Sequence, residues 1–488
     1  MKNIIKLLVL LPLFTMTACD DLFEPAIENN RDLDAMYSDP DYALGVLANG
    51  YILLPYNTSP TSDVATDDAV SNDNSNTWRA MATGAWTSQN DPASQWKNCY
   101  NAIQYLNLFL ERVESVPFSQ TENIQTMFVD SYSGEAYGLR AVYMYFLLRA
   151  HGGIGTDGQL LGVPIKTVSE SPESDFSQPR DTYAACIEQI LSDCDKAIEL
   201  LPLDYKDKHT ESEIPQKYLD LGINTDQYDR VNGVYRAGRI SGRIVEAVRA
   251  QAALMAASPA FAESGITWEE AANSAGTVLQ RIDGINGIDA DGYTWYCNTS
   301  EIAGLGNGSN PPEIIWRASY SDSNTLEGDN FPPSLYGNGR VNPTQNLVDA
   351  FPMANGYPID NSNSDYDAND PYANRDPRLA TYIITNESTA GNATITTGSY
   401  GTNNDAINRE SGHSTRTGYY MRKHLRFDCN LDPNYNTQQR HYSARIRYTE
   451  IFLDYAEAAN EAWGPKGTGS FGFSAYDVIK AIRTRAGV

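Results

Sequence analysis

The stretch "GEAYGLRAVYMYFLLRAHGG", residues 134–153, carries a helical pattern up to Arg149. It is rich in Ala, Leu and Tyr, and its apolar residues recur at intervals of three and four, which is typical of a helix that buries one face. A pair of glycines follows, and glycine commonly marks the end of a helix. The stretch therefore predicts a helix over residues 134–149.

Six further stretches carry helical periodicity, and Pro or Gly residues separate them. Several have an Ala-rich face, as in "EAVRAQAALMAA" and "DYAEAANEA", and small faces let helices approach closely, as in stacked hairpins of the tetratricopeptide kind. No clean 34-residue repeat is present, so the sequence predicts a mainly α scaffold of irregular helical hairpins. The six helices are expected at residues 96–113, 181–201, 242–257, 268–282, 447–463 and 474–485.

Long insertions rich in Asn, Ser, Thr, Gly, Pro and Tyr separate these helices, at residues 55–95, 203–238, 284–345 and 352–442. Loops of this length in a compact protein are usually functional. We therefore expect a helical scaffold on one side and a loop-rich face on the other. No Pro/Ser-rich linker divides the chain, which favours a single domain over residues 19–488.

The charge of the chain limits its partners. The sequence holds 36 Lys and Arg against 62 Asp and Glu, a net charge of −26. Such a field repels phosphate backbones and excludes nucleic acid as the expected partner. It also disfavours strongly anionic ligands unless a local basic patch overrides it. The 31 tyrosines suit wet binding surfaces, since each offers an apolar face and a polar tip.

The first residues have the features of a secretory leader. Lys2 and Lys6 precede a short apolar run and small residues up to Ala18, which predicts a signal peptide over 1–18. The run is shorter than the roughly 20 residues of a membrane-spanning helix. Cys19 after small residues resembles the lipobox of bacterial lipoproteins, in which the cysteine is acylated. The alternative is a structural cysteine, but we expect a lipid anchor at Cys19 as the only membrane contact.

The acidic pair Asp20-Asp21 follows this cysteine. It resembles the surface-export signal of Bacteroidetes lipoproteins, and a flexible acidic tether is the alternative.

Signatures of enzymes and cofactors are weak. The GxGxxG matches at 153–158 and 467–472 follow predicted helices rather than strands, which argues against a dinucleotide site. The sequence has no HExxH, GxSxG, Walker or CxxC motif, and its five histidines lack metal-ligand spacing. Cys186 and Cys194 would lie about 12 Å apart along one helix, too far for a disulfide. We therefore predict a non-enzymatic protein with no cofactor and no metal.

One acidic stretch, "DYDANDPYANRD", is a weak calcium candidate. It lacks the turn glycine and the final Glu of a calcium loop, so a solvated acidic loop is the favoured interpretation. Its oxygen-bearing residues at calcium-loop offsets are Asp365, Asp367, Asn369 and Asp376.

Eight blocks, in order, resemble the SusD/RagB family of nutrient-binding lipoproteins of Bacteroidetes. The block at 134–153 is similar to the family pattern G-E-A-x-x-L-R-A-x-x-Y-F-x-L-x-R-x-x-G-G. Each block alone is weak, but eight in order behind a lipoprotein signal are a strong match over nearly the whole chain. The other seven are 178–202, 238–261, "NPTQNLVDAF" (342–351), "NRDPRLATYI" (374–383), "TGYYMRKHL" (417–425), 447–462 and 478–488.

The resemblance implies about four irregular tetratricopeptide-like helix pairs with a loop-rich second face. It implies an outer-membrane lipoprotein at the cell surface, whose partner is a SusC-type TonB-dependent transporter and whose ligand is usually a glycan and sometimes a peptide. In the family the R-x-R-A-G block is normally followed by a further stretch, whereas this chain stops at Val488. The domain 19–488 is therefore expected to lack that stretch.

Glycan recognition needs aromatic platforms for sugar faces and planar polar groups for hydroxyls. Two insertions offer both, and the family tends to bind ligand through such loops. For each aromatic residue the alternative is packing against the scaffold, and Trp96 and Trp316 are expected in the core. The candidate ligand residues are Asp73, Trp78 and Arg79 in segment 67–80, and Tyr320, Phe331 and Tyr336 in segment 319–338.

These observations favour a glycan-binding lipoprotein that delivers oligosaccharide to the transporter. Peptide capture is the main alternative, and a deep groove with an unpaired strand edge would favour it. A surface glycosidase would need a buried carboxylate pair about 5–9 Å apart. A purely structural envelope protein would bind no small ligand.

Overall fold

The computed structural model describes residues 38–57, 59–306 and 308–488, so the expected leader 1–18 and Cys19 lie outside the described residues. Long helices of the described chain pack in order, each against the next, and form four pairs. This arrangement confirms the predicted mainly α scaffold with about four irregular helix pairs. The pairs are α2 (Pro40–Ile52) with α4 (Trp96–Leu110), α5 (Glu122–His151) with α6 (Tyr183–Leu200), α9 (Gly242–Ala257) with α10 (Trp268–Gln280), and α15 (Tyr448–Trp463) with α16 (Ala475–Ala486).

The helix boundaries agree with local capping chemistry. Thr267 begins α10 and Ser474 begins α16, and each exchanges two hydrogen bonds with the third helical residue. Left-handed Gly487 ends α16. The prediction for α9 is confirmed at both ends, and those for α4, α6, α10, α15 and α16 within three residues.

Two segments of the long helices were not predicted, and neither were the short helices of the insertions. Helix α5 begins at Glu122 rather than Gly134, and α2 lies before the first predicted helix. Residues 122–133 mix polar and β-branched side chains of modest helix propensity. They become helical because Ile124, Met127 and Phe128 are buried on one face against the core. Tertiary packing therefore decides this part of α5.

Residues of the 134–153 motif hold the helices together. Gly134 faces Leu201, and Gly138 faces Val245 of α9 so closely that an added Cβ would lie 2.9 Å from Val245 Cγ2. Buried Arg140 donates two hydrogen bonds of 2.7 Å to Asp193 of α6. These contacts explain why glycines and a buried charge lie within an otherwise apolar helix.

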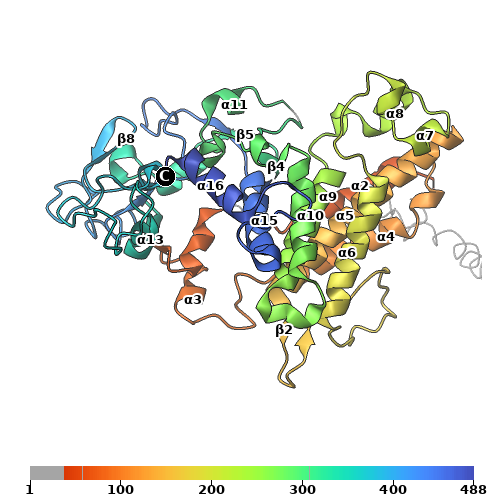
Figure 1. Ribbon diagram of the computed structural model, residues 1–488, viewed down its shortest axis with the longest axis horizontal. Coiled ribbons are helices and arrows are strands. Elements are labelled where there is room, and N and C mark those ends of the chain that lie inside the picture. The colour runs from red at the N-terminus through yellow and green to blue at the C-terminus, as the bar shows by residue number, and fades with distance from the viewer. Residues whose placement is uncertain (1–37, 58, 307) are drawn as a thin grey trace, which may run out of the picture.

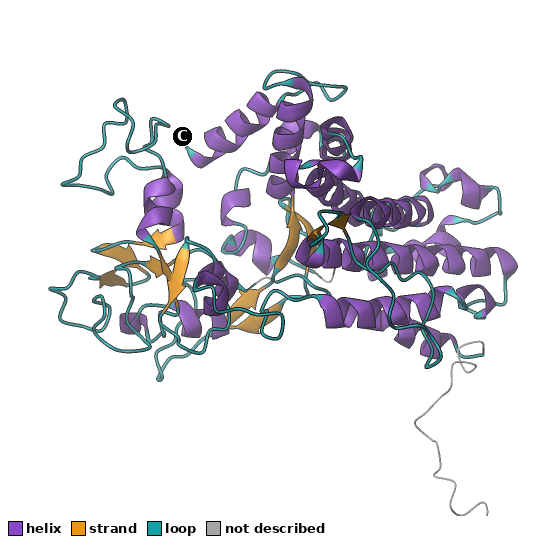
Figure 2. Ribbon diagram, turned by 90° about the horizontal axis from the view of Figure 1, so that it is seen from below, coloured by secondary structure: helices purple, strands orange, loops and turns teal. Residues whose placement is uncertain are grey.

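The loop-rich part contains short helices and two-stranded antiparallel ribbons rather than one continuous sheet. In Figure 1 it occupies the left of the molecule, the paired helices the right, and α15 and α16 lie between them; Figure 2 shows strands in the loop-rich part and near the centre. The ribbons are β1 (Ala69–Ser71) with β6 (Val341–Pro343), β2 (Gly153–Ile154) with β3 (Leu160–Leu161), β4 (Ile314–Arg317) with β12 (Ala444–Arg447), β5 (Ser321–Ser323) with β11 (Gln439–His441), β7 (Ile383–Ile384) with β10 (Tyr420–Met421), and β8 (Ser388–Ala390) with β9 (Ala393–Ile395).

The expected long insertions thus have some regular structure. Small hydrophobic clusters under these loops, around Trp295, Phe331, Val348 and Ile384, supplement the large core of the helix pairs. The short helices are α3 (Arg79–Ala82), α7 (Gln216–Leu219), α8 (Thr225–Asn232), α11 (Thr299–Ala303), α12 (Thr325–Asn330), α13 (Gln345–Ala350) and α14 (Pro377–Tyr382).

Three smaller predictions concern a glycine motif, a pair of cysteines and membrane-spanning helices. The GxGxxG match at 153–158 lies in the β2–β3 hairpin directly after α5, as expected. Cys186 and Cys194 are free and buried. Within the described ranges, no helix is both long and apolar enough to cross a bilayer.

Candidate ligand-binding site

A cavity of about 590 Å³ lies where the helical scaffold meets the loop-rich part. This volume is within the usual range for small-ligand pockets. From the scaffold side it is lined by β12 and the first turn of α15. From the loop side it is lined by the 3₁₀ helix η2 (Pro60–Ala65), the β5–β11 ribbon and α12. We treat this cavity as the candidate site.

An aromatic group forms one wall of the cavity. The ring of Trp295 lies 5.4 Å from that of Tyr442 and 5.8 Å from that of Tyr296, measured between centroids. The Tyr442 hydroxyl donates a 3.0 Å hydrogen bond to the Trp295 carbonyl. All three rings are more than nine-tenths buried, so they offer edges rather than open faces to the cavity.

His424 completes this wall in a strained conformation. Its φ of 72° lies in the left-handed region, which non-glycine residues rarely adopt. Its ring lies 5.5 Å from Tyr296. Burial, followed by the charges of Lys423 and Arg447, lowers the pKa of His424 to about 3. The imidazole is therefore neutral at physiological pH and adds no positive charge to the cavity.

Three cations also line the cavity, and they differ in their partners. Arg447 is paired with buried Glu313 at 3.2 Å. Half-buried Lys423 and Arg445 have no carboxylate within salt-bridge distance among the described residues. Instead, the Arg445 guanidinium lies 4.7 Å from the Trp316 ring centroid and Lys423 lies 5.2 Å from that of Tyr382. Burial lowers the pKa of both Lys423 and Arg445, because their charged forms are partly desolvated.

The acidic groups of the cavity are more exposed. Asp63, Asp329 and Glu450 line it, and each is solvent-exposed. Gln251 donates a 2.6 Å hydrogen bond to Glu450. Hydroxyls come from Ser321, Ser323 and other residues of the β5–α12 segment. The cavity thus combines aromatic edges, hydroxyls, carboxylates and two partly desolvated cations without ionic partners, a set that can bind a neutral or acidic polyhydroxyl ligand.

The two insertions proposed for the ligand site do meet. Strand β1 pairs with β6, and the Asn72 side chain donates to the Asn338 and Gly339 carbonyls at 2.9 and 2.8 Å. Segment 67–80 is therefore held beside the end of segment 319–338. None of the six candidate residues themselves, however, is among the described residues that line the cavity.

The candidates in segment 67–80 are engaged within their own loop. Asp73 accepts hydrogen bonds from the Ser75 amide and hydroxyl at 2.8 and 2.7 Å. Arg79 donates to Asn74 at 2.7 Å. Trp78 is half-buried at the start of α3. Their role in ligand binding stays a prediction.

The candidates in segment 319–338 have three different surroundings. Tyr320 is half-buried under the Arg440 guanidinium at 4.2 Å. Tyr336 is 58% exposed in a left-handed conformation. Phe331 requires a correction, because it is 3% exposed and stacks on Phe427 at 4.9 Å in a small core. Its ring cannot serve as a sugar platform while this core is intact.

The structure also shows the surroundings of the two tryptophans that were expected in the core and of the weak calcium stretch. Trp316 is 1% exposed, as expected for a core residue. Trp96 is 42% exposed and was wrongly placed in the core; its ring lies on the surface against Tyr100 and His151. In the weak calcium stretch, Asp376 caps α14 and pairs with Arg378, so this carboxylate is already engaged.

Several residues that line the cavity were missed because they lie outside the two segments, 67–80 and 319–338, that were chosen for the ligand site. "TGYYMRKHL" supplies Lys423 and His424, and "HYSARIRY" supplies His441, Arg445 and Arg447. The alternation of basic residues with Ile446 places both arginines on one side of β12. This alternation was visible in the sequence, whereas the meeting of the two blocks depends on the tertiary fold.

Comparisons with known proteins agree with this fold. A family model described as "SusD family" matches residues 312–488. A second model, described as "Starch-binding associating with outer membrane", matches residues 41–216. A curated relative, SusD-like protein P38 of Formosa agariphila, is 31% identical over 104 residues, which is 21% of this chain. The match spans only 17% of that relative's length.

Solved structures from Bacteroides fragilis NCTC 9343 share the architecture. One, a SusD-like protein, has a TM-score of 0.67 at 20% identity, covering 94% of this chain and 80% of that chain. Another, a SusD-like carbohydrate binding protein, has a TM-score of 0.65 at 19% identity, covering 93% and 80%. At this identity the likeness concerns the fold.

Proposed function

This chain belongs to the SusD family, and from that premise we propose that it captures glycans at the cell surface without catalysis. The observation that carries the proposal is the 590 Å³ cavity at the junction of scaffold and loops. A solved neighbour of the same fold is described as carbohydrate binding. We further propose that the cavity, rather than the loop tips alone, receives the ligand.

The chemistry of the cavity supports a polyhydroxyl ligand. Sugar hydroxyls both donate and accept, so they can use the Ser321 and Ser323 hydroxyls together with the exposed Asp63 and Glu450 carboxylates. The free cations Lys423 and Arg445 have no carboxylate to compete with a ligand oxygen in the described part of the chain. The aromatic wall adds apolar surface beside these polar groups.

The location and the partner belong to the same proposal. Cys19 would carry the lipid anchor and the segment 1–18 would be removed, leaving one domain over residues 19–488. A SusC-type TonB-dependent transporter would receive the ligand, as membership of the family suggests. Replacing Cys19 with Ala should release the protein from the membrane fraction, and retention of the variant there would contradict lipid anchoring at this residue.

The experiment that tests capture is affinity electrophoresis of the chain without its leader against neutral and acidic polysaccharides. Variants Arg445→Gln and Lys423→Gln remove the free cations of the cavity. Variants Trp78→Ala and Tyr336→Ala remove the exposed or half-buried aromatics outside it and serve as matched controls. Circular dichroism and melting curves establish that each variant is folded.

We expect at least one glycan to retard the wild-type protein. In the cavity variants the dissociation constant should rise about tenfold or more, because a hydrogen bond to a charged group contributes about 1.5–3 kcal/mol. Equal retardation of the cavity variants, with loss in the loop variants, would move the site to the two insertions. Retardation by no glycan would contradict capture of glycans and favour peptide ligands.

A further inference from the structure

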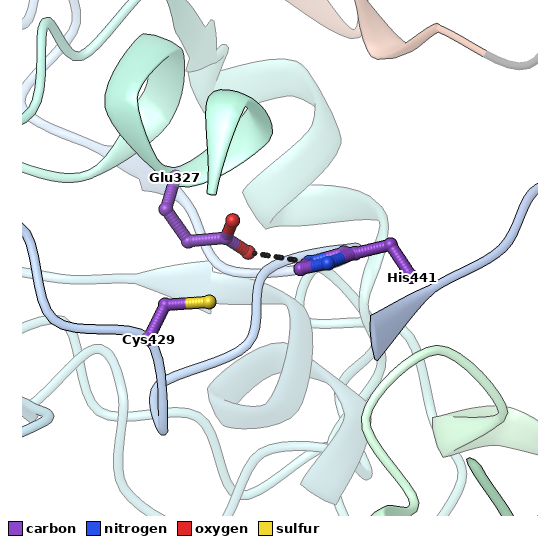
Figure 3. A group of neighbouring side chains, drawn as sticks. All are labelled: Glu327, Cys429 and His441. Atoms are coloured by element: carbon purple, nitrogen blue, oxygen red, sulfur yellow. Dashed lines mark hydrogen bonds and ion pairs between the residues drawn. The ribbon is translucent and has the colours of Figure 1, made fainter. Parts of the chain in front are cut away.

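Three potential metal ligands meet beside the cavity: Glu327, Cys429 and His441. One ligand atom from each lies within 4.8 Å of the others. Glu327 belongs to α12, His441 ends β11, and Cys429 lies in the loop that precedes β11. Figure 3 shows the three side chains pointing toward one another from these separate segments. His441 also lines the cavity.

Glu327 is the most buried member of the cluster. Its Oε1 accepts a 2.8 Å hydrogen bond from the Arg426 amide and lies 3.0 Å from His441 Nε2. Its Oε2 is buried and has no hydrogen-bond partner among the described residues. A buried polar atom without a partner costs about 1–3 kcal/mol. The carboxylate therefore has a free ligand position directed into the protein.

The orientation of His441 presents its second nitrogen to the cluster. His441 Nδ1 lies 2.8 Å from the Gln439 carbonyl oxygen. A carbonyl or carboxylate oxygen can only accept, so Nδ1 carries a proton toward Gln439 and Nε2 carries one toward Glu327; loss of the Nε2 proton frees this nitrogen to bind an ion. A ring fixed through a backbone carbonyl is a common arrangement of metal-binding histidines.

We propose that Glu327, Cys429 and His441 bind a divalent transition-metal ion of the zinc type. The donor set of carboxylate oxygen, thiolate sulfur and imidazole nitrogen suits zinc, whereas calcium and magnesium take oxygen ligands. Three protein ligands leave a fourth position for water, as in open zinc sites. The proposal differs from the sequence-based expectation of no metal site, since the three residues are far apart in the sequence and meet through the β5–β11 pairing and the loop around Cys429.

The charges and protons of the binding step balance. The Cys429 thiol and the Nε2–H group of His441 each release a proton to solvent as the sulfur–metal and nitrogen–metal bonds form, and no oxidant or reductant is needed. One thiolate and one carboxylate neutralise the divalent ion, so the buried cluster becomes electrically neutral.

The ion would add a direct link between three segments that hydrogen bonds already join, such as those from the Arg426 amide to Glu327 and from the Arg426 guanidinium to the Arg440 carbonyl. The Cys429 Sγ atom makes a long 3.7 Å contact with the Ser323 carbonyl and lies beside the Glu327 carboxylate. A bound ion would fix the loop around Cys429 against α12 and β11, at the border of the cavity. Because a ligand that binds only the folded state stabilises it, the metal should raise the melting temperature.

The test uses the chain without its leader, treated with chelator and titrated with Co²⁺ and then Zn²⁺. We expect one Co²⁺ per chain with the absorption of a thiolate–cobalt bond, its displacement by Zn²⁺, and a rise of several degrees in melting temperature. Cys429→Ser and His441→Gln should each weaken Zn²⁺ binding at least tenfold. Cys297→Ser is the matched control, because Cys297 is a half-buried free cysteine outside the cluster.

Two readouts keep folding separate from binding. The melting temperatures of the metal-free variants show whether the fold is retained, and His441→Gln tests the site even if Cys429→Ser is unstable. The absence of a thiolate–cobalt band in the wild type, or equal binding in the Cys429→Ser variant, would overturn the proposal and leave Glu327 and His441 as a buried ion pair. The outcome does not depend on whether the cavity binds glycan.

Discussion

Two charged residues of the 134–153 motif, Glu135 and Arg140, are buried and form ion pairs with residues from other parts of the chain. Glu135 is fully buried and pairs with Arg236 and Arg239, which lie about 100 residues further along the chain. A sequence shows which residue is charged, whereas the partner depends on packing between distant segments.

A buried ion pair can be compared with an exposed one on the same helix. Asp193 is fully buried and pairs with Arg140, whereas Asp195 is largely exposed and pairs with Arg249. Asp193→Asn should lower the free energy of unfolding by about 3–5 kcal/mol, because it leaves a buried guanidinium without its counter-charge. Asp195→Asn should cost at most about 1 kcal/mol. Urea denaturation measures both, and equal losses would contradict this account of α6.

Glycines of two helices give a second matched pair. An added Cβ at Gly138 would meet Val245 Cγ2 at 2.9 Å, whereas nothing lies within 4 Å of the position at Gly45 in α2. Overpacking costs about 1–3 kcal/mol and exceeds the gain of up to about 1 kcal/mol in helix propensity. Gly138→Ala should therefore lower the melting temperature and Gly45→Ala should raise it. A stabilised Gly138→Ala variant would show that α5 and α9 have room to separate.

The candidate site was predicted at the level of segments but not of residues. Segment 319–338 does contribute Ser321, Ser323 and Asp329 to the cavity, while Phe331 from the same segment is in a core. Composition cannot distinguish a solvent-facing aromatic residue from a buried one in an irregular loop. Such a loop has no helical or strand periodicity from which the direction of a side chain could be predicted. Of the two basic residues of β12 that line the cavity, Arg447 was assigned to the start of a predicted helix. Arg445 lies before that helix and outside both segments chosen for the site.

At the scale of elements, regular periodicity was the reliable signal. Helix α9 has a repeated apolar pattern and agreed at both ends with its prediction, whereas the ribbons, of two to four residues per strand, left no recognisable pattern. Such short strands are fixed by pairing with distant partners, as β5 is by β11. Their existence is therefore a consequence of the fold.

Helix α15 carries an acidic row, Glu450, Asp454 and Glu457, and this row predicts a pH effect. Burial, followed by the charges of Glu450 and Glu457, raises the pKa of Asp454 to about 8. Between the ordinary carboxyl pKa and pH 8 the folded chain keeps a proton that the unfolded chain has lost, so this residue makes stability fall as pH rises. The slope is at most about 1.4 kcal/mol per pH unit.

Asp454→Asn removes this titration, because the amide is neutral at every pH. The gain in urea midpoint over the wild type should be larger at pH 7 than at pH 5. Asp477→Asn is a control whose pH dependence should have the opposite sign. Hydrogen bonds from Ser474 lower the pKa of Asp477, so the ionised carboxylate stabilises the folded state, and this stabilisation is lost as pH falls. An advantage of Asp454→Asn that is independent of pH would show that Asp454 is ionised in the fold.

At the scale of the whole molecule, a strongly negative chain encloses a cavity with two free cations. The net charge of −26 acts on an approaching anion at long range, whereas Lys423 and Arg445 act at contact. The division of the chain at residue 18 and the single domain that follows it stay predictions. The arrangement of charges nevertheless predicts how salt affects the two stages of ligand binding.

Salt screens the long-range field, with a Debye length of about 8 Å at physiological ionic strength. For an acidic oligosaccharide the association rate should therefore rise with added salt, since repulsion by the net charge is weakened. Neutral oligosaccharides should show no such change. Arg445→Gln should speed dissociation of the acidic ligand and leave the salt dependence of association intact, because it barely alters the net charge. Surface plasmon resonance at several salt concentrations measures the association and dissociation rates separately. An association rate that falls with added salt would mean that the cavity cations, and not the overall charge, govern the encounter.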